Sequence, residues 1–134
     1  MMVHRATLIA AGIAGATAIT IGAFGAHGLE DQLAAAGMDA ATIERRLPQF
    51  ETGARYHLAH ALALLTLSVL PLPPGRLCSA ITWLIVAGIV LFSGSLYTLV
   101  ITNTPWLGAI TPIGGVCWIA AWSLVAVLGI QARE

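Results

Sequence analysis

The sequence predicts an all-α fold: an integral membrane four-helix bundle with a short interfacial helix in the first linker. Hydrophobic residues make up 58% of the 134-residue chain and charged residues only 9%, whereas a typical soluble domain carries about 25% charged residues. The apolar residues gather in four segments whose lengths suit helices that cross a bilayer. Short polar linkers separate these segments, so we expect successive helices to run in opposite directions.

The first span is predicted over residues 6–26, a run without a charged side chain. As an α-helix this run extends about 31 Å, which matches the hydrocarbon core of a bilayer. A cleaved signal peptide is the competing interpretation, because Arg5 precedes the run and Ala23-Phe24-Gly25 resembles a cleavage site. The length of the run and the three apolar segments behind it favour a membrane helix.

Three further spans complete the prediction, over residues 54–70, 77–102 and 109–130. The second is short for a membrane helix, and we expect it to extend upstream as a helix. The third is long enough to cross with tilt. Thr111 followed by Pro112 is typical of a helix start, because proline at the first helical position loses no intrahelical hydrogen bond.

The linker over residues 27–53 is predicted to hold an amphipathic helix. Asp39 suits a helix N-cap, and Ile43, Leu47 and Phe50 then share one face. This pattern is typical of a helix that lies in the plane of the membrane interface. Pro48 is expected to bend or break that helix.

Small residues recur within the apolar segments at steps of three and four. In lipid, such residues let two helices approach closely. We therefore predict tight helix packing, within the chain or between chains, at Gly15, Gly22, Gly25, Gly94, Gly114 and Gly115.

Four alternating spans bring the polar residues together on one side of the bilayer, the side of the 27–53 linker. Glu51 and Arg55 are four residues apart, in the favourable order for an ion pair on a helix. The residues on this side that we single out for structural or interaction roles are Glu51, Arg55, Tyr56, Ser93, Tyr97 and Thr111.

His60 lies about one turn beyond Tyr56, with apolar residues after it. An ionisable side chain at this depth indicates a functional site, although a hydrogen bond between helices is the commoner explanation of such a residue. With His27 from the same side it forms a candidate cofactor site for haem, metal or quinone. His57 would add a second imidazole three residues before His60.

Four segments resemble a known family: residues 22–29, 51–56, 92–97 and 108–115. In this order they are similar to the signatures of the YgdD/YwdK-like family of small membrane proteins of unknown function. The resemblance implies a four-helix membrane protein and no particular activity. The family pattern has Gln and Tyr at the positions of His57 and Ala59, which weakens a ligand set built on His57.

These features favour a non-enzymatic accessory subunit or assembly factor of a larger membrane complex, placed in the inner membrane of a bacterium. The expected partners are membrane lipid and other membrane subunits or further copies of the chain. Six basic and six acidic residues leave no positive surplus for nucleic acid. A cofactor-associated protein using His27 and His60 is one alternative. A small oligomeric transporter is another, disfavoured because no acid lies within a span. Both termini are predicted to be cytoplasmic.

Overall fold

A computed structural model describes residues 4–71 and 75–131, and throughout these ranges the fold is helical without a strand. The chain runs through helices and two short helical connections: α1 (Arg5–His27), α2 (Leu29–Ala35), α3 (Ala40–Val69), α4 (Arg76–Gly88), the π-helix η1 (Ile89–Ser93), α5 (Gly94–Thr102), the 3₁₀ helix η2 (Pro105–Ala109) and α6 (Thr111–Gln131). The all-α prediction is therefore confirmed.

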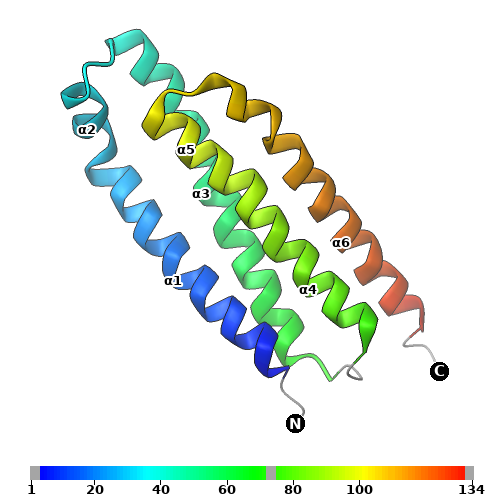
Figure 1. Cartoon of the computed structure of the whole chain (residues 1–134). Helices are drawn as coiled ribbons and strands as arrows, with labels where there is room; N and C mark the ends of the chain where they lie inside the picture. Colours follow the sequence, from blue (N-terminus) through cyan, green and yellow to red (C-terminus); the bar gives the residue numbers. More distant parts are fainter. Residues whose placement is uncertain (1–3, 72–74, 132–134) are drawn as a thin grey trace.

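Three helical stretches have the length and composition to cross a membrane. In residues 5–27, 76–102 and 105–131, a window of 18 residues has a mean hydropathy of 1.8, 2.3 and 2.1, respectively. The protein is thus a helical membrane protein, as predicted. The second half of α3 is also apolar and lies alongside these stretches (Figure 1), but it is shorter than they are and carries Arg55, His57 and His60. A fourth crossing over residues 54–70 stays a prediction.

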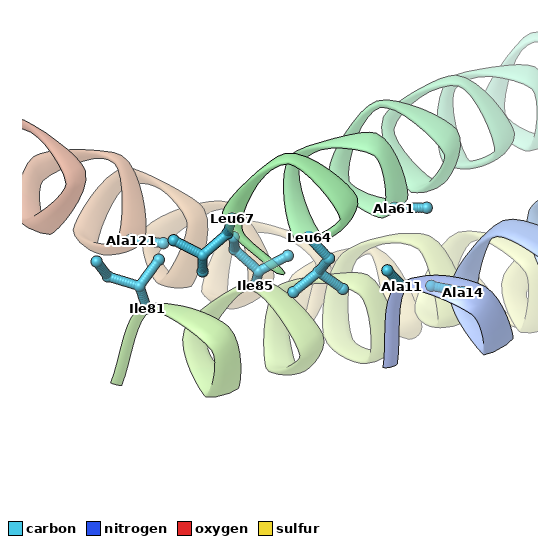
Figure 2. Packing of buried hydrophobic residues seen from close by; sticks show 8 residues of the cluster. All are labelled: Ala11, Ala14, Ala61, Leu64, Leu67, Ile81, Ile85 and Ala121. Atoms are coloured by element: carbon cyan, nitrogen blue, oxygen red, sulfur yellow. The ribbon is translucent and has the colours of Figure 1, made fainter. Parts of the chain in front are cut away.

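The long helices lie side by side, and both ends of the described chain lie at the same end of the bundle (Figure 1). α1 packs along α3, α6 packs along α4 and η1, and α3 joins the two pairs through α5 and η1. Figure 2 shows the core between them, where Leu64 and Ile81 are fully buried among alanines from α1, α3 and α6. Small side chains here allow the helices to approach closely, which drives helix association in lipid.

The outward faces of the bundle are apolar. Trp83, Ile119 and Ile130 are each about two-thirds exposed, at 69%, 68% and 70%. In water such surfaces would favour aggregation, whereas in a bilayer they face acyl chains. The core of the bundle is therefore narrow, and most of its apolar surface faces lipid.

The linker helix differs from the prediction. Residues 39–50 do not form a separate helix in the membrane plane, because they are the first part of α3, which continues through Pro48. Ile43 and Phe50, on either side of the proline, are both buried in a second core cluster with α2 and α5. Their burial offsets the hydrogen bond that proline removes. The short helix of the first linker is instead α2, which buries Leu29 and Leu33.

The predicted N-cap at Asp39 is confirmed. Its carboxylate accepts hydrogen bonds from the Thr42 backbone N–H at 2.9 Å and from the Thr42 hydroxyl at 2.8 Å. These bonds hold the pKa of Asp39 below its ordinary value, because they stabilise the charged form. The cap fixes the start of α3 outside the apolar part of the bundle.

The predicted packing glycines fall into three groups. A Cβ placed on Gly25 would lie 2.7 Å from the Phe50 ring, and one on Gly114 would collide with the Phe92 backbone. Gly94 and Gly115 meet only ordinary contacts at 4.0 and 3.9 Å. No atom lies within 4 Å of a Cβ on Gly15 or Gly22. Gly15 and Gly22, which are both half-buried, therefore provide no close approach within the chain, and their packing against another chain stays a prediction.

Candidate functional site

His60 is the centre of the candidate site. Its side chain is only 6% exposed, and its Nδ1 lies 2.8 Å from the Tyr56 backbone carbonyl oxygen. A carbonyl oxygen only accepts, so Nδ1 carries the proton and Nε2 keeps a lone pair. The Trp122 indole N–H donates to that lone pair across 3.4 Å, which is long for a hydrogen bond. His60 Nε2 is therefore a hydrogen-bond acceptor that faces α6 and receives only a long hydrogen bond.

Aromatic rings surround His60. The His60 ring stacks on Trp118, with 3.8 Å between ring centroids and 5° between planes. Trp118 is held in place by its own N–H, which donates to the Ile85 carbonyl oxygen at 3.2 Å. The Tyr56 ring also stacks on Trp118, with 5.7 Å between ring centroids, and the Phe92 ring centroid lies 4.7 Å from that of Trp118.

The rings and His60 line a groove of about 610 Å³ between α3 and α6. We name it the aromatic groove; its lining includes Tyr56, His60, Phe92, Trp118 and Trp122. Tyr56 is 46% and Trp122 54% exposed on the outside of the bundle, so the groove opens toward lipid. It can accept a flat ring with one hydrogen-bonding group.

His57 is as buried as His60 and joins three helices. Its Nε2 lies 3.4 Å from the Thr17 hydroxyl of α1, and its Nδ1 lies 3.3 Å from the Tyr97 hydroxyl of α5. The Thr17 hydroxyl donates to the carbonyl oxygens of its own helix, at 2.9 and 3.1 Å. Its oxygen therefore accepts from His57 Nε2–H, and Tyr97 donates to Nδ1. This arrangement makes His57 a structural crosslink.

The structure does not bring His27 and His60 together. His27 is exposed at the end of α1, ten residues or about 15 Å along the helix from Thr17, which contacts α3 at His57. His27 lines a separate polar pocket with acids of α2 and Glu51. Within residues 4–71 and 75–131 no three His, Cys, Asp or Glu side chains gather to hold a metal ion. A joint His27–His60 ligand set is therefore wrong.

Glu51 and Arg55 are both exposed on α3, and the predicted ion pair between them stays a prediction. The buried cation is Arg46 instead, at 6% exposure. It donates to Asn103 Oδ1 from Nε at 3.1 Å and from Nη2 at 2.7 Å. Burial lowers the pKa of Arg46 from its ordinary value, and the neighbouring charge of Arg45 lowers it further.

The remaining predicted residues lie near the ends of α5 and α6. Ser93 is fully buried in η1, four residues before Tyr97. Ser95 donates to the Phe92 carbonyl oxygen at 2.9 Å and lies 2.8 Å from the Thr111 hydroxyl, at the start of α6. Because the Ser95 proton is used within its own helix, Thr111 donates to Ser95. The Ser95 and Thr111 hydroxyls thus join α5 to α6.

A family model described as a protein of unknown function (DUF423) matches residues 21–115. The chain belongs to the DUF423 family. The DUF423 protein is 42% identical over 116 residues to the UPF0382 membrane protein YwdK of Bacillus subtilis, covering 85% of this chain and 87% of that one. It is 35% identical over 136 residues to the UPF0382 inner membrane protein YgdD of Escherichia coli K12, covering 99% and 95%.

A UPF0382 membrane protein of Staphylococcus saprophyticus is 39% identical over 110 residues, covering 82% of the DUF423 protein and 84% of that relative. No solved structure matches. The family resemblance seen in the four sequence signatures is thus confirmed. The names of these relatives state a membrane location and no enzymatic activity.

Proposed function

We propose that this DUF423 protein is a non-enzymatic protein of the bacterial inner membrane that serves as an accessory subunit or assembly factor of a larger membrane complex. The observation that carries the proposal is the outer side of α1. Gly12, Gly15 and Gly22 lie on it, and a Cβ at each would meet no atom within 4 Å.

These glycines serve no close contact inside the chain. Each costs about 1 kcal/mol of helix stability relative to alanine. In lipid, glycines at steps of three and seven along one face let a second helix approach closely enough for backbone contacts. Only 17% of the α1 span is buried within the chain. A transmembrane helix of a partner subunit is the occupant that this surface fits.

The polar side chains of the apolar helices support a role without catalysis. Thr66, Thr98 and Ser123 each donate to the carbonyl oxygen four residues earlier, as hydroxyls in membrane helices commonly do. A nucleophile needs instead a base within hydrogen-bonding reach. The acids of the described chain lie in α2, at the α3 cap or in the first half of α3, ahead of residue 54. That placement disfavours a proton-coupled transporter.

Replacing Gly15 by leucine tests the docking surface. We expect the variant to fold as well as the wild type, because the new side chain enters open space. The amount of partner polypeptide that it binds should fall about tenfold, since helix packing in lipid depends on small residues. Native mass spectrometry of tagged protein, gently extracted from its own membranes, measures the bound polypeptide.

Gly129 of α6 provides the matched control, because a Cβ there also meets no atom within 4 Å. Gly129→Leu adds the same side chain to another outer face and should leave the partner bound. If the wild type carries no second polypeptide, or if Gly15→Leu retains as much as Gly129→Leu, the proposal is wrong.

A second candidate function is favoured by the aromatic groove: binding of a quinone ring. The hydrogen bond from the Trp122 N–H to the His60 Nε2 lone pair is long, at 3.4 Å. A quinone carbonyl would accept from that N–H, and the hydroxyl of the reduced ring would donate to that lone pair. Stacking on Trp118 would supply the apolar contact.

Titration of the purified protein with a short-chain quinone, followed by tryptophan fluorescence, tests this candidate. We expect saturable quenching in the wild type and about fivefold weaker binding in His60→Leu, the effect of one lost hydrogen bond. His27→Leu is the control, because His27 is exposed and lines another pocket. Equal binding by the two variants would exclude the role of His60.

A further inference from the structure

A second groove lies at the opposite end of the bundle from α2, between the beginnings of α1 and α4. It has a volume of about 450 Å³, and we name it the basal groove. Its lining includes Arg5 and Thr7 from α1, and Ser79, Thr82 and Trp83 from α4. None of these residues lines the aromatic groove.

The basal groove changes from polar to apolar along its length. Arg5 and Ser79 are exposed and lie in the first turns of the two helices. The Thr7 and Thr82 hydroxyls are 3.1 Å apart and join the helices across the groove. Ala10, Val86 and Trp83 continue the lining deeper into the bundle, over about one further helical turn. A polar mouth above an apolar wall is the pattern of a phospholipid.

Among the residues that the structure describes, the charged side chains at this end are arginines. The described acidic residues are Glu30, Asp31, Asp39, Glu44 and Glu51, and all of them lie in α2, at the α3 cap or in the first half of α3, at the other end of the bundle. Arg5 and Arg76 therefore have no acidic side chain of the described chain at their own end. Both also begin a helix, where the backbone dipoles add positive potential.

We infer that the basal groove binds an anionic phospholipid, with its phosphate on Arg5 and an acyl chain along Ala10, Val86 and Trp83. The guanidinium offers two parallel N–H groups that match phosphate oxygens, and Ser79 provides a hydroxyl donor beside it. A free phosphate would leave the apolar wall without an occupant, which favours a lipid. The inference does not depend on the proposed docking surface of α1.

Native mass spectrometry of the full chain in detergent, titrated with phosphatidylglycerol or with phosphatidylcholine of the same acyl chains, tests the inference. We expect the wild type to retain phosphatidylglycerol over phosphatidylcholine by about tenfold, in line with a charge-assisted hydrogen bond in a partly buried site. Arg5→Gln should abolish most of this preference. Arg45→Gln removes an exposed arginine at the other end and should leave it unchanged.

Two further measurements distinguish a bound phospholipid from a bound free phosphate. Soluble glycerol phosphate at millimolar concentration should not displace the lipid; displacement would show that the groove holds free phosphate and would overturn the inference. Trp83→Ala, at a side chain that is 69% exposed, should weaken retention while the fold is kept. Equal retention of the two lipids by the wild type, or an unchanged preference in Arg5→Gln, would also overturn it.

Discussion

Replacing Gly114 by alanine should destabilise the protein by about 2 kcal/mol or more, the range of overpacking in a tight interior. A Cβ at this position would collide with the Phe92 backbone N–H and lie 2.8 Å from the Phe92 Cβ and 2.9 Å from the Leu91 carbonyl carbon. The obstacle is the main chain of η1, so no change of rotamer relieves it. Circular dichroism during thermal unfolding in a mild detergent measures the loss.

The neighbouring glycine supplies the control. A Cβ on Gly115 would lie 3.9 Å from the Phe92 ring, an ordinary contact. Gly115→Ala should therefore be neutral or stabilise α6 by up to about 1 kcal/mol, through the better helix propensity of alanine. Equal unfolding temperatures for Gly114→Ala and Gly115→Ala would contradict the close approach of α6 to η1.

This approach positions the aromatic groove. Gly88 of α4 faces the Trp118 indole so closely that a Cβ there would collide with Trp118 Nε1 and Cδ1. Together, Gly88 and Gly114 allow α6 to lie against α4 and η1, where Trp118 reaches the Ile85 carbonyl oxygen and stacks on His60. The geometry of the site therefore depends on the close packing of these two glycines.

The fold class was predictable because lipid imposes simple demands on sequence. Long uncharged runs and few charges are enough to predict membrane helices. The continuity of α3 was not predictable in this way. Pro48 carries a local penalty that is visible in the sequence, whereas the burial of Ile43 and Phe50 that offsets it depends on α2 and α5. Local signals predict breaks, and tertiary contacts decide whether a break occurs.

The candidate site was predictable only in part. Four alternating spans place His27 and His60 on one side of the bilayer, but the topology gives no depth, and the two residues lie at different levels of the bundle. The contacts of Trp118 and Trp122 with His60 were not predictable, since nothing local in the sequence relates these tryptophans to α3. Arg46 carried a usable signal: with Phe50, Gly53 and His57 it recurs at steps of four, three and four along the buried face of α3.

Arg46→Met should cost about 2 kcal/mol, because it removes charge-assisted hydrogen bonds from a buried position. Arg46 donates twice to Asn103 Oδ1 and once to Gln49 Oε1, at 3.0 Å. Asn103 ends α5 in the left-handed region, at φ 49°, and the two residues tie the beginning of α3 to the end of α5. Methionine keeps most of the length and apolar surface, so the loss measured by thermal unfolding reports the hydrogen bonds.

Two substitutions at Asn103 separate its side chain from its backbone. Asn103→Gly keeps the left-handed conformation and removes the acceptor, whereas Asn103→Ala also adds about 1 kcal/mol of backbone strain. In a double-mutant cycle, Arg46→Met should cost much less in the Asn103→Gly background, with a coupling of about 1–2 kcal/mol. Additive losses would mean that the Arg46–Asn103 bonds do not hold α3 to α5. Strong coupling would mean that the bundle is anchored outside the membrane spans, by the part of α3 that precedes Pro48.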